Sequence, residues 1–136
     1  LTMPEPRPVA LVGELLATQA KVAGVAALLV DAAVRDLEEL RGVGLPIWAR
    51  YVRVSGAEKR VPGVIGEPVE VAGARIRQGD VVVLDADGAV VVERERVAEV
   101  LEEALARAER EREKRPKLEA GELSYDLDGL RQLVEQ

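Results

Sequence analysis

The 136-residue sequence contains no cysteine, no histidine and no phenylalanine. Without cysteine it has no disulfides, thiol nucleophiles or thiolate metal sites. Without histidine it cannot be a Ser-His hydrolase or hold zinc through imidazole. Aromatic residues make up only 2% of the chain, too few for a base-stacking platform, and the formal net charge of -6 disfavours a phosphate-binding surface. We therefore expect no nucleic-acid partner, and any metal ion must have oxygen ligands, which suits magnesium, manganese or calcium.

Long hydrophobic runs are also absent. No apolar run approaches the roughly 20 residues that a membrane-spanning helix needs, and the first residues lack a signal-peptide pattern. The length corresponds to one domain. These features predict a soluble, cytoplasmic protein with no membrane association.

The first third of the chain predicts alternating helices and strands. The prolines near the N-terminus indicate that residues 1–12 form an extended lead-in. Apolar spacing over residues 10–23 predicts a helix that Gly24 ends. The apolar run 25–30 predicts a buried strand closed by Asp31, and residues 36–41 predict a short helix stopped by glycines.

The remainder predicts short strands followed by one long helix. Asp87-Gly88 is typical of a hairpin turn. The helix is expected over residues 94–115, with Pro116 ending it and residues 116–136 forming a tail. The predicted strands are 47–54, 67–71, 75–76, 80–84 and 89–92. This order favours an α/β fold of packed layers over a doubly wound series, with residues 13–115 as its domain.

Potential functional residues gather between Gly13 and Asp36. Gly13 and Glu14 open a predicted helix, whose free N–H groups could bind a carboxylate. Arg35 and Asp36 follow a predicted strand, and ligands of α/β folds favour the carboxyl ends of strands. The alternative is that the acids are helix-start residues and Arg35 forms a surface ion pair, which spacing alone favours. Asp31 either orients Arg35 or merely ends the strand.

Three other groups of residues have simpler interpretations. An aspartate group could be a metal cluster, but the neighbouring glycines favour turns. A basic loop could meet an anion, but a solvated loop is the simpler reading. Trp48 is expected to be a packing residue. The aspartates are Asp80, Asp85 and Asp87, and the basic residues are Arg53, Lys59 and Arg60.

The stretch GELLATQAKVAGVAALLVDAAVRDLEELR (13–41) resembles the signature of a family of class II pyruvate aldolases. This RraA-like family includes 4-hydroxy-4-methyl-2-oxoglutarate aldolase and the regulator of ribonuclease E activity. Its pattern is an acid, twenty residues and then Arg-Asp, which Glu14 and Arg35-Asp36 match. Residues 66–94 resemble the family's second block, and residues 118–131 resemble the tail of the aldolase branch.

The resemblance implies a role for each residue of this pattern. Asp36 would bind Mg²⁺ or Mn²⁺ together with water, and Arg35 would bind the pyruvyl part of a substrate. Glu14, where many members have Asp, would activate a water for proton transfer. The helix-start amides would hold the substrate carboxylate, and they belong to Gly13, Leu15, Leu16 and Ala17.

The resemblance also implies a layered αββα sandwich similar to the swivelling phosphohistidine domain, assembled as a homotrimer or hexamer. An acid from a neighbouring subunit's C-terminal helix would complete the site, carried by Glu109, Glu111 or Glu113. A charge run at a helix end is otherwise a solvated face. Family members have several tens of residues before the first signature helix, so the N-terminal part of the family domain is expected to be missing here.

The expected function is a metal-dependent aldolase that releases pyruvate from a 4-hydroxy-2-oxo acid, with oxaloacetate decarboxylation as a side activity. The substrates implied are 4-hydroxy-4-methyl-2-oxoglutarate and 4-carboxy-4-hydroxy-2-oxoadipate. The alternative is a non-catalytic binding protein of the ribonuclease E regulator type, or an inactive truncated relative.

Overall fold

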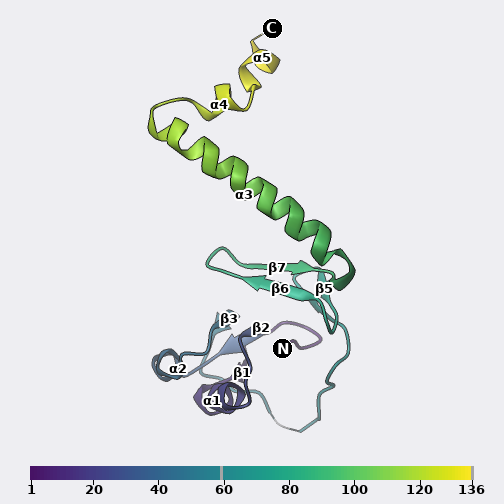
Figure 1. Ribbon diagram of the computed structural model, residues 1–136. Helices are drawn as coiled ribbons and strands as arrows, with labels where there is room; N and C mark the ends of the chain where they lie inside the picture. Colours follow the sequence, from purple (N-terminus) through teal and green to yellow (C-terminus); the bar gives the residue numbers. More distant parts are fainter. Residues whose placement is uncertain (59, 136) are drawn as a thin grey trace. The chain divides into compact units, whose positions relative to one another are not determined.

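The computed structural model describes residues 1–58 and 60–135 (Figure 1). The chain forms two compact units, Leu1–Glu93 and Arg94–Gln136. The first unit contains all the strands, and the second is helical.

The first unit begins with a βαβαβ arrangement. Its elements are β1 (Ala10–Val12), α1 (Glu14–Val22), β2 (Leu28–Val34), α2 (Leu37–Val43) and β3 (Ile47–Val52). The strands form a parallel sheet in the order β1-β2-β3. Both crossovers, β1-α1-β2 and β2-α2-β3, advance across the sheet in the same direction. Since such crossovers have the same handedness, both helices lie on one face of the sheet, where they contact each other (Figure 1).

The core of this unit lies between the parallel sheet and the two helices. Val12 and Val30 are its largest fully buried side chains, and β-branched residues suit a pleated surface. Ala17 is completely buried, so its small side chain allows α1 to lie close to the sheet. The buried cluster consists of Val12, Ala17, Val30, Ala32, Val34, Leu40 and Leu45.

Two antiparallel hairpins complete the first unit. They are formed by β4 (Val69–Val71) with β5 (Ala74–Ile76) and by β6 (Val81–Leu84) with β7 (Ala89–Val92). Half-buried Trp48 of β3 donates its indole N–H to the carbonyl of Asp85, 2.6 Å away. This bond ties the parallel sheet to the loop between β6 and β7.

The aspartates of the hairpin region take part in turns, as predicted. The Asp85 carboxylate accepts the backbone N–H groups of Asp87 and Gly88, at 2.8 and 3.1 Å. The Asp80 carboxylate accepts the N–H of Arg77 at 2.8 Å. Over residues 1–58 and 60–135, no group of three or more acidic side chains is placed to hold a metal ion.

The second unit consists of a 3₁₀ turn (Arg94–Arg96), α3 (Val97–Glu119), α4 (Ser124–Leu127) and α5 (Leu130–Val134). Lys114 of α3 donates to Ser124 and Asp128, both at 2.7 Å, which ties α4 back to α3. No helix among the described residues is both long and apolar enough to cross a membrane.

The predicted start of the chain is wrong in one respect. Residues 10–12 are neither lead-in nor helix but the strand β1, and the helix begins at Glu14. The strand arises because Ala10 and Val12 pair with Ala33 and Val34, more than twenty residues away. Three residues are too few to show the period-two pattern of a strand, so the sequence carries no local signal for it.

Two further boundaries differ from the predictions. The predicted strand 25–30 lies at Leu28–Val34, because Val25 donates to the carbonyl of Ala20 and prolongs the turn after α1. Pro116 lies inside α3, which continues to Glu119. Pro116 cannot donate a hydrogen bond to the preceding turn, but its carbonyl still accepts the N–H of Ala120 near the end of the helix.

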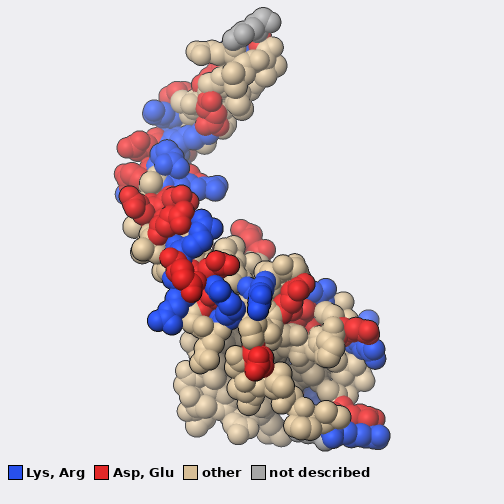
Figure 2. Space-filling model, turned by 90° about the vertical axis from the view of Figure 1, so that its right-hand side faces the viewer, with Lys and Arg blue, Asp and Glu red and all other residues tan. Residues whose placement is uncertain are grey.

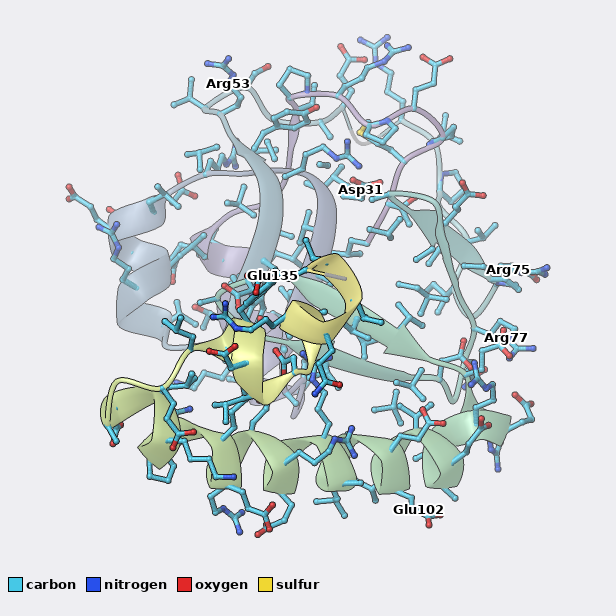
Figure 3. All side chains as sticks on the ribbon, turned by 90° about the horizontal axis from the view of Figure 1, so that it is seen from above. Asp31, Arg53, Arg75, Arg77, Glu102 and Glu135 are labelled. Atoms are coloured by element: carbon cyan, nitrogen blue, oxygen red, sulfur yellow. The ribbon has the colours of Figure 1, made fainter. Side chains whose placement is uncertain are left out.

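Asp31 is a buried member of β2 rather than the residue that ends it (Figure 3). Its side chain is 4% exposed, and its Oδ1 accepts Nε of Arg50 from β3 at 2.5 Å. This hydrogen bond raises the pKa of Arg50. Both sequence interpretations of Asp31 are therefore wrong: it neither orients Arg35 nor closes a strand, but joins β2 to β3.

Replacing Arg50 by Met should destabilise the protein, because the Asp31 carboxylate would stay buried without its partner. We expect the free energy of unfolding to fall by about 2 kcal/mol in urea denaturation. Arg53→Met is the matched control, since Arg53 is exposed just beyond β3 and makes no ion pair with a described residue. Equal losses in the two variants would contradict this assignment.

Candidate functional site

An open cleft lies at the carboxyl ends of β1 and β2 and has a volume of about 710 Å³. Three segments form it: the start of α1, the turn between β2 and α2, and the stretch after β3. Parallel strands present their carboxyl ends and the N-termini of the following helices at one edge, which is where α/β folds bind ligands. The charged residues that line the cleft are Arg35, Asp36, Glu58 and Arg60.

Asp36 lies between β2 and α2 with a left-handed backbone, φ 62° and ψ 49°. Aspartate tolerates this conformation better than most residues, and such conformations cluster at functional sites. Its Oδ2 accepts the backbone N–H of Glu14, the first residue of α1, at 3.2 Å. The carboxylate thus lies at the positive end of the neighbouring helix, where the unpaired N–H groups attract a negative charge.

Gly13 permits this approach. A Cβ atom at this position would lie 2.5 Å from Oδ2 of Asp36 and 3.1 Å from Nε of Arg35. The Gly13 backbone is extended, with φ -129°, a conformation that any residue can adopt. Glycine is therefore needed here because a side chain would not fit. The absence of a side chain therefore allows the turn after β1 to contact the turn after β2.

Arg35 is held to the sheet through its backbone. Its N–H donates to the carbonyl of Val12 at 3.0 Å, which joins the ends of β2 and β1. Its side chain is half-exposed, with Nε 3.6 Å from Oδ2 of Asp36. A guanidinium in this place offers a planar pair of donors to a carboxylate or keto oxygen in the cleft.

The first turn of α1 leaves two amides for an anion. The N–H of Glu14 is bound to Asp36, and the N–H of Ala17 donates to the carbonyl of Gly13 at 3.1 Å. The N–H groups of Leu15 and Leu16 make no hydrogen bond to any described residue. Of the amides predicted to bind a carboxylate, those of Leu15 and Leu16 therefore remain available. The Ala17 amide is used in the helix, and the Ala17 side chain is buried in the core.

Glu14 is adjacent to the cleft without lining it. Its Oε1 accepts the hydroxyl of Thr18, one turn along α1, at 2.9 Å. The structure thus brings five of the predicted residues together around the cleft and leaves the Glu14 side chain on the helix surface. Those five are Gly13, Leu15, Leu16, Arg35 and Asp36.

Sequence reasoning missed the contribution of Gly56 and Ala57, which line the cleft after β3. A lone glycine after the predicted strand 47–54 indicates a turn and carries no signal for a binding site. Arg60 of the basic loop also lines the cleft, and its Nε is paired with Glu58 at 3.0 Å. Lys59 lies outside the described residues.

The donor set at Asp36 fits a magnesium or manganese ion with a water-rich coordination shell. Magnesium in proteins keeps several waters and is held through one or two carboxylates. Oδ2 of Asp36 is bound to Glu14, whereas Oδ1 has no partner among the described residues. Asp36 could therefore supply one oxygen ligand, with water and substrate as the others.

The three glutamates predicted to complete the site of a neighbouring subunit are exposed on α3. Glu109 pairs with Arg112 at 2.5 Å and Glu111 with Arg107 at 2.7 Å, whereas Glu113 has no ion pair in the described chain. The hydrogen bond from Arg107 holds the pKa of Glu111 below its usual value. Charged side chains of both signs cover this helix (Figure 2), as on a solvated face. A contact with another subunit stays a prediction.

The chain thus has a cleft at the strand ends of an α/β unit, lined by Arg35 and Asp36 beside a helix N-terminus. The sequence profile of the RraA-like family, described as Aldolase/RraA, matches residues 5–91. The chain therefore belongs to the RraA-like family, as the resemblance implied.

One relative is a protein of Halalkalibacterium halodurans provisionally named 4-hydroxy-4-methyl-2-oxoglutarate aldolase. It is 34% identical over 95 residues, which are 70% of this chain and 45% of that protein. The chain spans about half the length of the curated relatives it matches.

Solved structures share the fold. Streptomyces coelicolor RraAS2, described as an unusual member of the RNase ES inhibitor RraA family, has a TM-score of 0.73 and 30% identity, covering 80% of this chain and 56% of that one. An uncharacterized protein of Pseudomonas syringae has a TM-score of 0.81 at 24% identity, covering 90% and 62%. These likenesses confirm the predicted α/β class and its similarity to RraA-family folds.

Replacing Asp36 tests its role in the local structure. Asp36→Ala removes the acceptor for the Glu14 N–H and places alanine in a left-handed conformation, so we expect a loss of about 1–2 kcal/mol in unfolding free energy. Asp36→Asn keeps an acceptor oxygen and tolerates the backbone, so it should lie within about 0.5 kcal/mol of the parent protein. If urea denaturation showed equal losses for Asp36→Asn and Asp36→Ala, the hydrogen bond from the Glu14 N–H to Asp36 would not explain the loss of stability.

Proposed function

We propose that the cleft is the pyruvate-binding site of a divalent-metal-dependent aldolase. Its substrates would be 4-hydroxy-2-oxo acids of the 4-hydroxy-4-methyl-2-oxoglutarate or 4-carboxy-4-hydroxy-2-oxoadipate type, with oxaloacetate as a decarboxylation substrate. The observation that carries this proposal is the placement of Arg35 and Asp36 at the start of α1. The provisional aldolase name of the Halalkalibacterium relative supports it.

The amides and the arginine would bind the pyruvyl end of the substrate. The N–H groups of Leu15 and Leu16 point out of the first turn of α1 and can donate to the substrate carboxylate. The Arg35 guanidinium can donate to the keto oxygen, on which negative charge develops as the carbon–carbon bond breaks. Mg²⁺ or Mn²⁺ held by Asp36, when bound, supplies further positive charge for that oxygen.

Cleavage between C3 and C4 also requires a proton acceptor for the 4-hydroxyl group, which becomes a carbonyl. We assign this role to Glu14 acting through a water molecule, because Thr18 holds its carboxylate on the helix surface beside the cleft. The electron pair of the broken bond passes to the pyruvate enolate, and protonation at C3 gives pyruvate.

The proposed assembly is a homotrimer or hexamer in which Glu109, Glu111 or Glu113 of one copy reaches the cleft of another. Glu113 is the most available of the three for such a contact, because the other two are paired with arginines of their own helix. This ranking follows from their contacts within one chain.

A second candidate function is a non-catalytic regulator that binds an RNA-processing enzyme. The similarity to a Streptomyces coelicolor protein of the RNase ES inhibitor family favours it. Such a role would use the surface of the protein without requiring the charge of Asp36. Asp36→Asn should therefore remove aldolase activity and leave binding to the partner intact.

Pyruvate release provides the test of the aldolase. The 136-residue protein is incubated with 4-hydroxy-4-methyl-2-oxoglutarate or oxaloacetate and Mg²⁺, and pyruvate is measured by coupled reduction to lactate. Asp36→Asn should lower kcat/KM by about 100-fold or more, and Arg35→Lys by about 10- to 100-fold because lysine lacks the planar fork. A chelator should abolish turnover.

The matched controls are Asp87→Asn and Arg41→Lys, which make the same chemical changes at exposed positions away from the cleft. Both should keep the parent rate. Turnover that survives the chelator and Asp36→Asn would refute the proposed mechanism, and a folded protein without turnover would favour the regulator.

A further inference from the structure

The segment after β3 passes the end of β2 and pairs with the far edge of β1. Arg53 donates its N–H to the carbonyl of Val34, so the chain is still beside β2 at that point. Two residues later, Ala10 donates to the carbonyl of Ser55 at 2.7 Å, and Ala57 donates to the carbonyl of Ala10 at 3.1 Å. Ser55–Ala57, here called the strap, thus forms a parallel bridge to β1 centred on Gly56.

The strap brings the backbone of Gly56 against the head of Arg35. A Cβ atom at Gly56 would lie 2.8 Å from Nη1 of Arg35 and 3.7 Å from its Cζ. Gly13 is close to a different part of the same side chain, since a Cβ atom there would lie 3.1 Å from Nε and 3.2 Å from Cγ. Gly13 therefore confines Arg35 from Cγ to Nε, and Gly56 confines the end of the guanidinium at Nη1.

The requirement for glycine at position 56 is one of space. Its φ lies outside the left-handed region, so alanine could adopt the same backbone. The atom that an added methyl group would meet is the far end of a flexible side chain, which moves more easily than a strap held by two backbone hydrogen bonds. An alanine at this position should therefore displace the guanidinium and leave the fold unchanged.

We infer that the strap is a positioning device for Arg35, and that Gly56 is the positioning residue within it. The half-exposed ion pair with Asp36, at 3.6 Å, is too weak to fix the guanidinium alone. The strap supplies a wall that limits where Nη1 can lie and thus where the cleft presents its paired donors. Its effect on turnover rests on the proposed function, but its effect on the Arg35 side chain does not.

The first measurement follows the Arg35 side chain directly. In protein labelled with ¹⁵N-arginine, the Nε–Hε signal of Arg35 is identified by its loss in Arg35→Lys. Gly56→Ala should shift this signal, whereas Gly63→Ala should leave it in place, because nothing lies within 4 Å of a Cβ atom at Gly63. An unmoved Arg35 signal in Gly56→Ala would overturn the inference, whether or not the protein is an aldolase.

The second measurement tests the consequence for binding. Oxalate, a planar analogue of the pyruvate enolate, is titrated calorimetrically with Mg²⁺ present. Gly56→Ala should weaken its binding by about 10- to 100-fold, as expected for a donor displaced by up to about 1 Å. In the Arg35→Lys background the same change should cost less than about twofold, because a flexible lysine lacks Nη1 and can avoid the methyl group.

Thermal unfolding distinguishes positioning from a structural defect. Gly56→Ala should keep the midpoint of the parent protein. A lowered midpoint that Arg35→Lys does not restore would show that the methyl group disturbs the strap itself, which would overturn the inference. If the parent protein fails to bind oxalate, the proposed function is in doubt, and the Arg35 signal alone decides the positioning role.

Discussion

The parallel pairing of β1 with β2 is the constraint on which the candidate site depends. Ala10 and Val12 of β1 pair with Ala33 and Val34 of β2, which lie more than twenty positions along the chain. Because the two strands run in the same direction, their carboxyl ends meet, and the turns that follow them lie side by side. The N–H of Glu14 thereby reaches the carboxylate of Asp36, and the backbone of Arg35 binds the last residue of β1.

The charges of the site are held in place more by backbone geometry than by their mutual attraction. Arg35 and Asp36 are about half-exposed, and an ion pair in that setting contributes at most about 1 kcal/mol. Backbone hydrogen bonds and the close approach of Gly13 and Gly56 restrict these side chains more strongly. The pair of Asp31 and Arg50 differs, since the Asp31 carboxylate is buried and requires the partner that compensates its charge.

Local chemistry made much of the fold predictable. The hairpin aspartates form turns as predicted, because their carboxylates bond to backbone N–H groups within three residues. The strands from β3 to β7 were anticipated to within a few residues, since valine runs alternate with glycine turns. The strand β1 was not, because its partners are distant. Asp31 was predicted to close its strand, but β2 continues past it to Val34.

The sequence by itself determined which chemistry is available and to which family the chain belongs. With histidine and cysteine absent, only carboxylates, arginines and backbone amides can form a site, and the spacing of Glu14 to Arg35-Asp36 marks the family. Only the tertiary structure decided which of these groups meet. Asp36 faces the start of α1, Glu14 lies against Thr18, and Gly56 abuts Arg35. These contacts arise from strand pairing across long loops, and local periodicity contains no information about such pairing.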